Sequence, residues 1–396
     1  MRVLFLCGVF AEENEQEIIN AAKRPVEYSA NEMQKKLIQG FQQCQCEIDV
    51  VSAPFIGSYP NASAIVRFHG FVKEQMKYQY VHFNNIWGIR NISRARALKK
   101  AVCSFVKNPD ANKMIVVYSP HTPFMEAAAY AKKVDPAIKI CMILPDLPHY
   151  MNLDANVSLL YKLGKKFDIN RFNHLNQYVD SYMLLTEAMK EKIDIHGQPY
   201  IVAEGIVDTE SVCSSVKQNN TKTMVYTGKL NEKFGVKNLV DAFRQLDNTD
   251  YRLILCGKGD AEDYVSEKCK EDSRIVYLGQ VTPEDAKKWV ANATVLVNPR
   301  QNNEEYTKYS FPSKNIEYLL SGNPVVAYML DGIPSEYCEF MYVVNGDSVE
   351  ALAQTLGEAL NDTDENIRSK SLKARKYLKT LTAKEIAGKL LMLNEK

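Results

Sequence analysis

Long apolar runs and a strong charge of one sign are both lacking in this sequence, and each absence excludes a class of protein. No run approaches the roughly 18 apolar residues that a membrane-spanning helix needs. The formal net charge is +1, with +5 over residues 1–198 and −4 over the remainder. This imbalance is too weak to indicate nucleic acid as a partner, although the first half could still face an acidic acceptor or a membrane.

Cysteine motifs for metal binding and a signal peptide are lacking as well. The nine cysteines include no C-x-x-C pair, and Cys44-Gln-Cys46 alone does not make a zinc site. The first apolar run, Val3–Cys7, is followed by Gly8 and by four glutamates within residues 12–17, which is wrong for a signal peptide. We therefore expect reduced thiols and a cytoplasmic protein.

Length and the order of apolar runs predict two α/β domains. At 396 residues the chain is too long for one ordinary core. Short apolar runs alternate with helical patterns up to Tyr200–Val202, and after a polar stretch at 209–222 the same plan restarts at Thr223–Thr227. This alternation predicts two Rossmann-like, doubly wound parallel sheets.

The predicted elements are short and evenly spaced. The strands are Val3–Cys7, Cys46–Ser52, Tyr80–Asn84, Met114–Tyr118, Ile138–Leu144, Ser181–Leu185 and Tyr200–Val202, then Thr223–Thr227, Tyr251–Cys256, Arg274–Leu278, Thr294–Val297, Pro324–Tyr328 and Met341–Val344. The named helices are Glu27–Cys44, Ser93–Val106, Pro123–Lys133, Asn366–Leu378 and Ala383–Leu393.

The stretch Val295–Tyr328 organises the second half, because it reads as strand, polar loop, helix and strand. Apolar residues in Ser313–Ser321 have helical spacing, Ser310 is available as the N-cap, and Gly322 is a suitable stop. Pro312 is tolerated at such a helix start. The loop and the helix N-terminus therefore predict a place where an anion could bind.

Three side chains at this helix start suit a nucleotide. Ser310 and Ser313 offer hydroxyls and Lys314 an ammonium to a diphosphate, beside the positive end of the helix dipole. One turn further on, Glu317 is a carboxylate placed to accept hydrogen bonds from ribose hydroxyls. A diphosphate beside a ribose describes a nucleotide.

Four runs carry a resemblance to a known family: YTGKLNEKFGVKNLVDAF at 226–243, LILCGKGDAEDY at 253–264, VYLGQVTPEDAKKWVANATVLVNPR at 276–300 and YSFPSKNIEYLLSGNPVVA at 309–327. Their order and spacing resemble the donor half of GT-B glycosyltransferases of family 4, in the branch that builds bacterial surface polysaccharides. MLLTEAM at 183–189 and IVAEGIVD at 201–208 resemble the end of the first domain and the hinge.

The resemblance implies an α/β, GT-B fold in which two Rossmann-like domains face each other across a cleft. Residues 1–200 would form the acceptor-binding domain and residues 201–379 the donor-binding domain. The helix at about 380–396 would pack back on the first domain, as expected for the family. The first half matches only in outline.

The resemblance also implies the reaction. It describes a retaining, metal-independent transferase that moves a sugar from a nucleoside-diphosphate donor, most simply a UDP-hexose, to a glycan or lipid-linked acceptor. A GT-B nucleotide-sugar epimerase is one alternative. A non-catalytic GT-B partner subunit, binding a glycan or another transferase, is the other.

Two family motifs depart from their norm in this chain. Glu317 matches the second Glu of E-x7-E, which holds the ribose, but Tyr309 stands where the first Glu touches the donor sugar. In G-R-L-x-x-x-K-G, the Arg and Lys that bind the diphosphate correspond to Lys229 and Phe234, with Lys233 one place early. We expect Lys314 and Ser310 to replace the missing cation, since a buried diphosphate without cations is costly.

The remaining donor-side residues follow from the matched runs. Gly8 and Gly228 would line the cleft from its two sides, and Gly257, Gly259 and the backbone at Gln280 and Val281 would lie near the base. The same loop adds Phe311 and Ser313 beside Tyr309 and Ser310. Of all these residues, we expect Lys314 and Lys229 to act on the reacting diphosphate.

His121 is the catalytic candidate on the acceptor side. It follows the predicted strand Met114–Tyr118, where a Rossmann-like domain presents ligand loops, and the resembling enzymes often keep a His on this wall. Asp146 and His149 follow the next strand and are further polar candidates. No metal site is expected, because the one D-x-D, Asp362-Thr-Asp364, lies in a polar turn between helices.

The segment 159–178 is the candidate for peripheral membrane contact. It places Leu160, Leu163 and Phe167 on one helical face with lysines and Arg171 around it. Such a helix could lie on an anionic bilayer at the inner face of the membrane, or it could be an ordinary surface helix.

Overall fold

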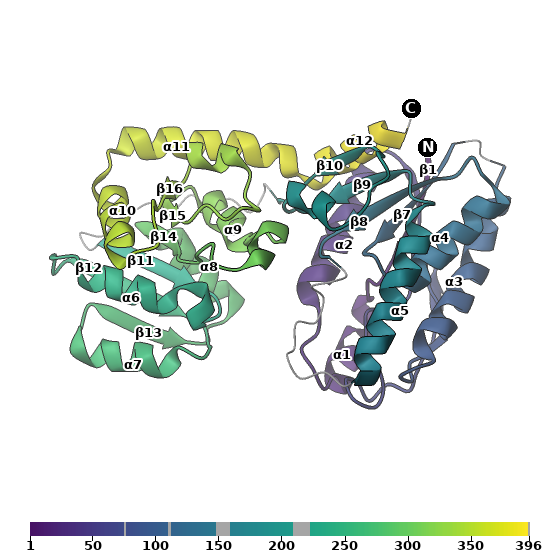
Figure 1. Ribbon diagram of the computed structural model, residues 1–396, viewed down its shortest axis with the longest axis horizontal. Coiled ribbons are helices and arrows are strands. Elements are labelled where there is room, and N and C mark those ends of the chain that lie inside the picture. The colour runs from purple at the N-terminus through teal and green to yellow at the C-terminus, as the bar shows by residue number, and fades with distance from the viewer. Residues whose placement is uncertain (75–76, 110–111, 148–158, 209–221, 395–396) are drawn as a thin grey trace. The chain divides into compact units, whose positions relative to one another are not determined.

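The computed structural model describes residues 1–74, 77–109, 112–147, 159–208 and 222–394 (Figure 1). The chain divides into two compact units. The first contains Met1–Ile206 and Thr382–Lys396, and the second contains Val207–Leu381. The second unit is therefore one continuous segment, whereas the first is closed by a helix from the far end of the sequence.

The first unit contains short antiparallel strand pairs as well as parallel strands. Its elements are β1 (Arg2–Cys7), α1 (Glu12–Ala21), α2 (Tyr28–Gln43), β2 (Glu47–Ser52), β3 (Arg67–Phe68), β4 (Phe71–Lys73), β5 (Tyr78–Tyr80), β6 (Phe83–Asn84), α3 (Arg90–Lys107), β7 (Lys113–Tyr118), α4 (Thr122–Val134), β8 (Lys139–Leu144), α5 (Leu159–Asn176), β9 (Ser181–Leu184), η2 (Glu187–Glu191), β10 (Tyr200–Val202) and α12 (Ala383–Asn394).

Within the described residues, eight of these strands form one sheet in the order β10-β9-β8-β7-β1-β2-β5-β4, and β3 and β6 pair separately. All neighbours are parallel except β4 and β5. The central strands β1, β7 and β8 are buried along nearly their whole length because helices cover them. α3, α4 and α5 pack in succession on the sheet (Figure 1).

On α2, Gly40 allows α12 to approach closely. A Cβ at Gly40 would lie 2.2 Å from the carbonyl oxygen of Ala383. The hydroxyl of Ser181 on β9 donates to Oδ1 of Asn394 at 3.0 Å, and both residues are buried. The last helix is therefore part of the core of the first unit.

The second unit consists of β11 (Lys222–Thr227), η4 (Glu232–Phe234), α6 (Val236–Arg244), β12 (Tyr251–Cys256), α7 (Glu262–Glu271), β13 (Ile275–Gly279), α8 (Pro283–Asn292), β14 (Val295–Asn298), η5 (Glu305–Tyr309), α9 (Ser313–Ser321), β15 (Val325–Ala327), η6 (Ser335–Glu339), β16 (Tyr342–Val343), α10 (Val349–Asn361), α11 (Asp364–Leu378) and η7 (Lys379–Leu381). Its strands form a parallel sheet in the order β13-β12-β11-β14-β15-β16.

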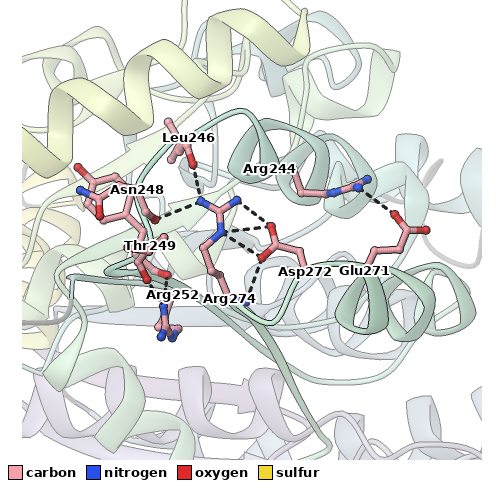
Figure 2. Close-up of polar contacts among 9 residues, drawn as sticks. Arg244, Leu246, Asn248, Thr249, Arg252, Glu271, Asp272 and Arg274 are labelled. Atoms are coloured by element: carbon pink, nitrogen blue, oxygen red, sulfur yellow. Dashed lines mark hydrogen bonds and ion pairs between the residues drawn. The ribbon is translucent and has the colours of Figure 1, made fainter.

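Arginines with carboxylate partners hold the loops that lead into β12 and β13 (Figure 2). Arg274 pairs with Asp272 at 2.7 Å, and its Nη1 also donates to the carbonyl oxygens of Leu246 and Asn248. Arg244 pairs with Glu271 at 2.8 Å. The charges of both guanidinium groups are therefore paired with carboxylates inside the unit.

One predicted strand is wrong. Tyr80–Asn84 does not form a single strand, because β5 ends at Tyr80 and β6 pairs with β3 in a separate two-stranded sheet. The amide of Val81 bonds to Ser52, whereas the amide of Asn85 bonds to Val66. The backbone changes partners within four residues, which an apolar run cannot reveal.

Candidate functional site

The strand order places a topological switch point at the carboxyl ends of β11 and β14. The chain proceeds from β11 outward to β12 and β13, and then returns to β14 on the other side of β11. Doubly wound sheets bind ligands in the crevice that this reversal leaves. Gly228 directly follows β11, and Arg300 stands two residues after β14.

Glycines bring the loops after β11 and β12 into backbone contact. The amide of Gly228 donates to the carbonyl of Cys256 at 2.9 Å. A Cβ on Gly257 would lie 1.7 Å from the carbonyl oxygen of Gly228, and Gly257 has a φ of +138°. A Cβ on Gly259 would lie 2.3 Å from the carbonyl oxygen of Leu230. These positions therefore require glycine for packing alone, whatever ligand the loops also meet.

Helix α9 begins without a side-chain cap. Its N-cap is Pro312, and the prediction that Ser310 caps it is wrong. Ser310 has extended dihedrals, and its hydroxyl accepts a hydrogen bond from Nη2 of Arg300 at 3.3 Å. The predicted stop at Gly322 is confirmed, with φ at +79°. An N-terminus without a side-chain cap leaves its first turn available to an anion.

Buried polar contacts fix α9 against the sheet. Nδ2 of Asn298, at the end of β14, donates to Oδ1 of Asn315 at 2.6 Å. The hydroxyl of Tyr318 accepts from the amide of Thr227 at 2.9 Å. Burial raises the pKa of Tyr318, so it remains a neutral hydroxyl. The first turn of α9 is thereby held at the switch point on two sides.

The predicted cation and the predicted ribose carboxylate are partners. Nζ of Lys314 lies 2.7 Å from Oε2 of Glu317, and both side chains are partly exposed. Lys314 also influences Cys256 at the end of β12, where its charge opposes the larger effect of burial on the thiol pKa. Lys314 and its partner Glu317 therefore lie near the carboxyl end of β12.

Other predicted donor-side residues are distributed between core and surface. Tyr309 is 4% exposed, and Phe311 is buried with its ring 5.3 Å from that of Tyr337. These two side chains belong to the core, so only their backbone can face a ligand. Ser313, Lys229, Lys233 and Gln280 are exposed, whereas Val281 is half-buried.

Arg300 is a polar residue at this edge that the sequence did not single out. Its Cζ lies 5.5 Å from the ring centroid of Phe234 and 4.8 Å from that of Tyr306. Its Nε is buried without a hydrogen-bond partner among the described residues. Two features of the sequence could have indicated Arg300. It stands just after a predicted strand, and Phe234 occupies the position where the family has lysine.

In the first unit, the switch point lies between β1 and β7, which carry Gly8 and His121 at their carboxyl ends. Gly8 is buried, and its amide donates to Oε1 of Gln34 at 2.7 Å. A Cβ at Gly8 would lie 2.4 Å from the ring of Phe55. An aromatic ring therefore covers Gly8.

His121 is the N-cap residue of α4 and lies among aromatic rings. Its ring centroid is 5.8 Å from that of Phe55 and 4.9 Å from that of Phe124. Its Nδ1 is buried and has no partner in the described part of the chain. Burial, and then the charges of Arg94 and Arg90, hold its pKa well below the usual 6.5. The imidazole is neutral and suits a hydroxyl better than an anion.

Two arginines of α3 hold the loop that carries Phe55. Arg94 is 1% exposed and donates to the carbonyl of Pro54 at 2.6 Å, and Arg90 donates to the carbonyl of Ile56 at 3.1 Å. The loop is gripped on both sides of Phe55. The ring beside His121 is therefore fixed by the backbone that carries it.

Asp146, His149 and the D-x-D sequence complete the predicted set. Asp146 is exposed at the surface, but desolvation by the residues around it, and then the charge of Glu27, raises its pKa. His149 lies outside the described residues. Asp362 accepts from the hydroxyl of Tyr342 and from Nδ2 of Asn366 at 2.9 Å, so it serves the start of α11.

The predicted membrane helix corresponds to α5. Phe167 is 67% exposed, and Arg171 bonds to Glu126 on α4 at 2.8 Å. In the described ranges of the chain, no helix is both long and apolar enough to cross a bilayer. Contact with a membrane surface stays a prediction.

Comparison with known proteins connects the second unit to a family. Residues 221–362 match the family described as Glycosyl transferases group 1. An uncharacterized glycosyltransferase of Methanocaldococcus jannaschii is 27% identical over 120 residues. That match covers 29% of this chain and 29% of the relative. The chain therefore aligns with less than a third of this relative's length.

Solved structures resemble the whole chain. Sucrose-phosphate synthase from Thermosynechococcus elongatus has a TM-score of 0.63 at 14% identity, covering 100% of this chain and 98% of that one. The lipopolysaccharide outer core galactosyltransferase WaaB has a TM-score of 0.64 at 12% identity, with 99% of each chain covered. Anabaena HepE, solved in complex with UDP, has a TM-score of 0.57 at 14% identity, covering 100% and 98%.

These likenesses confirm the predicted fold, a GT-B architecture of two Rossmann-like domains. The family match in the second unit supports a glycosyltransferase.

Proposed function

We propose that the protein is a glycosyltransferase that moves a sugar, most simply a hexose, from a nucleoside diphosphate to a glycan or lipid-linked acceptor. The observation that carries the proposal is the start of α9 without a side-chain cap, held at the switch point of the second unit with Lys314 and Glu317 on its first two turns. The same segment lies within the matched region 221–362.

The side chains divide the nucleotide between them. Glu317 is proposed to accept hydrogen bonds from the ribose hydroxyls. When the donor binds, Lys314 would exchange part of its contact with Glu317 for a contact with the diphosphate. Lys229, Ser310 and Ser313 add donors to the phosphate oxygens, and the backbone at Gly228, Gly257 and Gly259 meets them without side chains. Uridine is the proposed base, which the UDP complex of the similar HepE supports.

The proposed reaction retains the configuration at the sugar carbon. The bond between the anomeric carbon and the diphosphate oxygen breaks, and its electron pair stays on the diphosphate. The acceptor oxygen bonds to the same face of that carbon, and its proton passes to the departing phosphate oxygen. His121, as a neutral imidazole, is proposed to hold a hydroxyl of the reacting sugar.

The wider assignment follows the resemblance of the sequence. We place the enzyme in family 4, in bacterial surface polysaccharide synthesis, and in the cytoplasm with peripheral membrane contact through α5. Asp146 and His149 would serve the acceptor side. No metal is required in this proposal, since protein cations neutralise the leaving group.

The test is incubation of the purified protein with a panel of nucleotide sugars, with product detection by NMR. Release of nucleoside diphosphate and of a sugar with retained configuration supports the proposal. Conversion of one nucleotide sugar into its epimer would instead establish an epimerase. Binding of a glycan with no turnover of any donor would overturn the enzymatic assignment in favour of a partner subunit. Lys314→Ala is the matched variant, since it should lower release by roughly a hundredfold or more without unfolding the chain.

A further inference from the structure

We propose that Arg300 supplies the second cation of the diphosphate site, in place of the lysine whose position Phe234 occupies. This inference rests on the proposed function, because it assumes that the second unit binds a nucleoside diphosphate. It concerns a residue of this chain that the sequence motifs do not mark.

The position of Arg300 is the first argument. β14 ends at Asn298, so Arg300 enters the loop beside β11 at the switch point. Its Nη2 donates to Ser310 at 3.3 Å, in the loop that leads into α9. Arg300 therefore connects the strand end with the helix start on which the proposed site is built.

Its influence on Tyr226 places the charge close to the backbone of Gly228. The positive charge of Arg300 opposes the larger effect of burial, which raises the pKa of Tyr226. The hydroxyl of Tyr226 donates to the carbonyl of Lys229 at 2.8 Å and would lie 3.1 Å from a Cβ on Gly228. The guanidinium thus acts where the loop after β11 begins.

The donors of Arg300 are only partly used. Nε is buried without a partner, and within the described part of the chain no carboxylate forms an ion pair with Arg300. Arg274 and Arg244 in the same unit have carboxylates at 2.7 and 2.8 Å (Figure 2). A half-buried guanidinium without a counter-ion is unfavourable, and a diphosphate would supply the missing negative charge to its planar fork of donors.

Phe234 then has a role of its own. The guanidinium carbon of Arg300 lies 5.5 Å from the centroid of Phe234 and 4.8 Å from that of Tyr306. Aromatic faces attract cations and restrict their orientation. Replacing lysine by phenylalanine at 234 removes one cation from the loop after β11 and provides a support for another from the loop after β14. The second cation for the diphosphate therefore comes from the loop after β14 and not from the loop after β11.

The experiment compares affinities for uridine diphosphate and uridine by titration calorimetry. Arg300→Ala should weaken diphosphate binding by roughly tenfold to a hundredfold, the range for a charge-assisted hydrogen bond, and leave uridine binding unchanged. Arg300→Lys should retain part of the affinity. Arg252→Ala is the matched control, because its guanidinium bonds to the carbonyls of Thr249 and Tyr251 at the start of β12, and it should bind both ligands as wild type does.

A double variant provides a second readout. If Arg300 replaces the lysine that the family has at position 234, Phe234→Lys should restore diphosphate affinity in the Arg300→Ala background. Equal diphosphate affinity of Arg300→Ala and wild type would overturn the role of Arg300 while leaving the proposed function intact. Equal losses for uridine and its diphosphate would also overturn it, since the effect would then be structural. Absence of diphosphate binding by wild type would refute the proposed function itself, once adenosine and guanosine diphosphates have also failed.

Discussion

Lys314 and Glu317 form an ion pair of 2.7 Å across one turn of α9, at the carboxyl edge of the second sheet. The pair joins the two charges that the sequence assigned to different parts of one ligand. A surface pair of this kind contributes about 0–1 kcal/mol to stability. Its exchange for ligand contacts therefore costs little, and each side chain can be tested separately for binding and for fold.

Glu317→Ala should weaken nucleoside-diphosphate binding while leaving the fold intact. Two ribose hydroxyls donating to a carboxylate are worth about 1.5–3 kcal/mol, or tenfold and more in dissociation constant. Calorimetry with uridine diphosphate and its 2′-deoxy analogue measures the effect. The variant should no longer distinguish the two ligands, and unchanged affinity for uridine diphosphate would contradict the ribose assignment.

Lys314→Ala should reduce turnover more than Lys233→Ala. Charge grows on the diphosphate as the glycosidic bond breaks, and removing one fixed donor there costs about 2.7–4 kcal/mol, or roughly a hundredfold or more. Lys233 is exposed, with its Nζ 5.4 Å from the ring of Phe234. Its loss should cost less than about tenfold. A larger loss for Lys233 in steady-state assays would mean that the loop after β11 holds the phosphate.

Chelation of metals should leave activity unchanged. The leaving diphosphate is expected to be neutralised by protein cations, and Asp362 in the one D-x-D sequence is engaged with Tyr342 and Asn366. Turnover measured before and after dialysis against EDTA tests this. Loss of activity that added manganese restores would show that the site has been misassigned.

His121 should make stability depend on pH below about 6.5. Its pKa is depressed in the folded protein, mainly by burial, so the unfolded chain takes up a proton first as pH falls. The free energy of unfolding is therefore highest above the pKa that His121 has in the unfolded chain. It falls by about 1.4 kcal/mol per pH unit as the pH drops from that value towards the pKa in the folded protein. Urea unfolding at pH 7.5 and 5.5 should show a smaller loss for His121→Gln than for wild type. His174→Gln, at an exposed position, is the control and should behave as wild type.

Gly257→Ala should destabilise the second unit and prevent donor binding. Its φ is +138°, and the added Cβ would meet the carbonyl oxygen of Gly228 at 1.7 Å. Strain of this kind costs on the order of 1–3 kcal/mol. Gly357→Ala on α10 is the matched control, because no described residue outside its own helix turn lies within 4 Å of the new Cβ. In thermal melts the control should gain about 0.5–1 kcal/mol, since alanine favours a helix. Equal melting temperatures for Gly257→Ala and wild type would contradict the packing argument.

The fold was largely readable from sequence because buried parallel strands appear as continuous apolar runs. β12 has the predicted bounds, Tyr251–Cys256, and β8 begins one residue after its predicted start. α1 was not anticipated, since only Asn14 and Ile18 of its residues are buried and the apolar pattern is weak. The division between β5 and β6 was missed because it depends on partners distant in sequence.

The site could be predicted only as far as local chemistry determines it. The start of α9 with Lys314 and Glu317 followed from the order of residues along one helix. Arg300 did not, because its partners come from separate segments and its significance lies in having no carboxylate partner among the residues that the structure describes. The hydroxyl of Ser310 was assigned to a cap for the same reason, since the competing donor lies ten residues earlier.

The return of α12 to the first unit reverses the order in which the two cores can mature on the ribosome. Residues 1–206 emerge first, but their core includes Ile386 and Leu390, and Ser181 finds its buried partner only in Asn394. Residues 207–381 form one continuous segment, and the described strands of their sheet all lie within it. Domains fold as units during synthesis, so we expect the second unit to close while the first still exposes the face of α2 that α12 will cover. During that interval we expect the nascent chain to expose the apolar residues that α12 later covers, and exposed apolar surface of this kind is what chaperones bind.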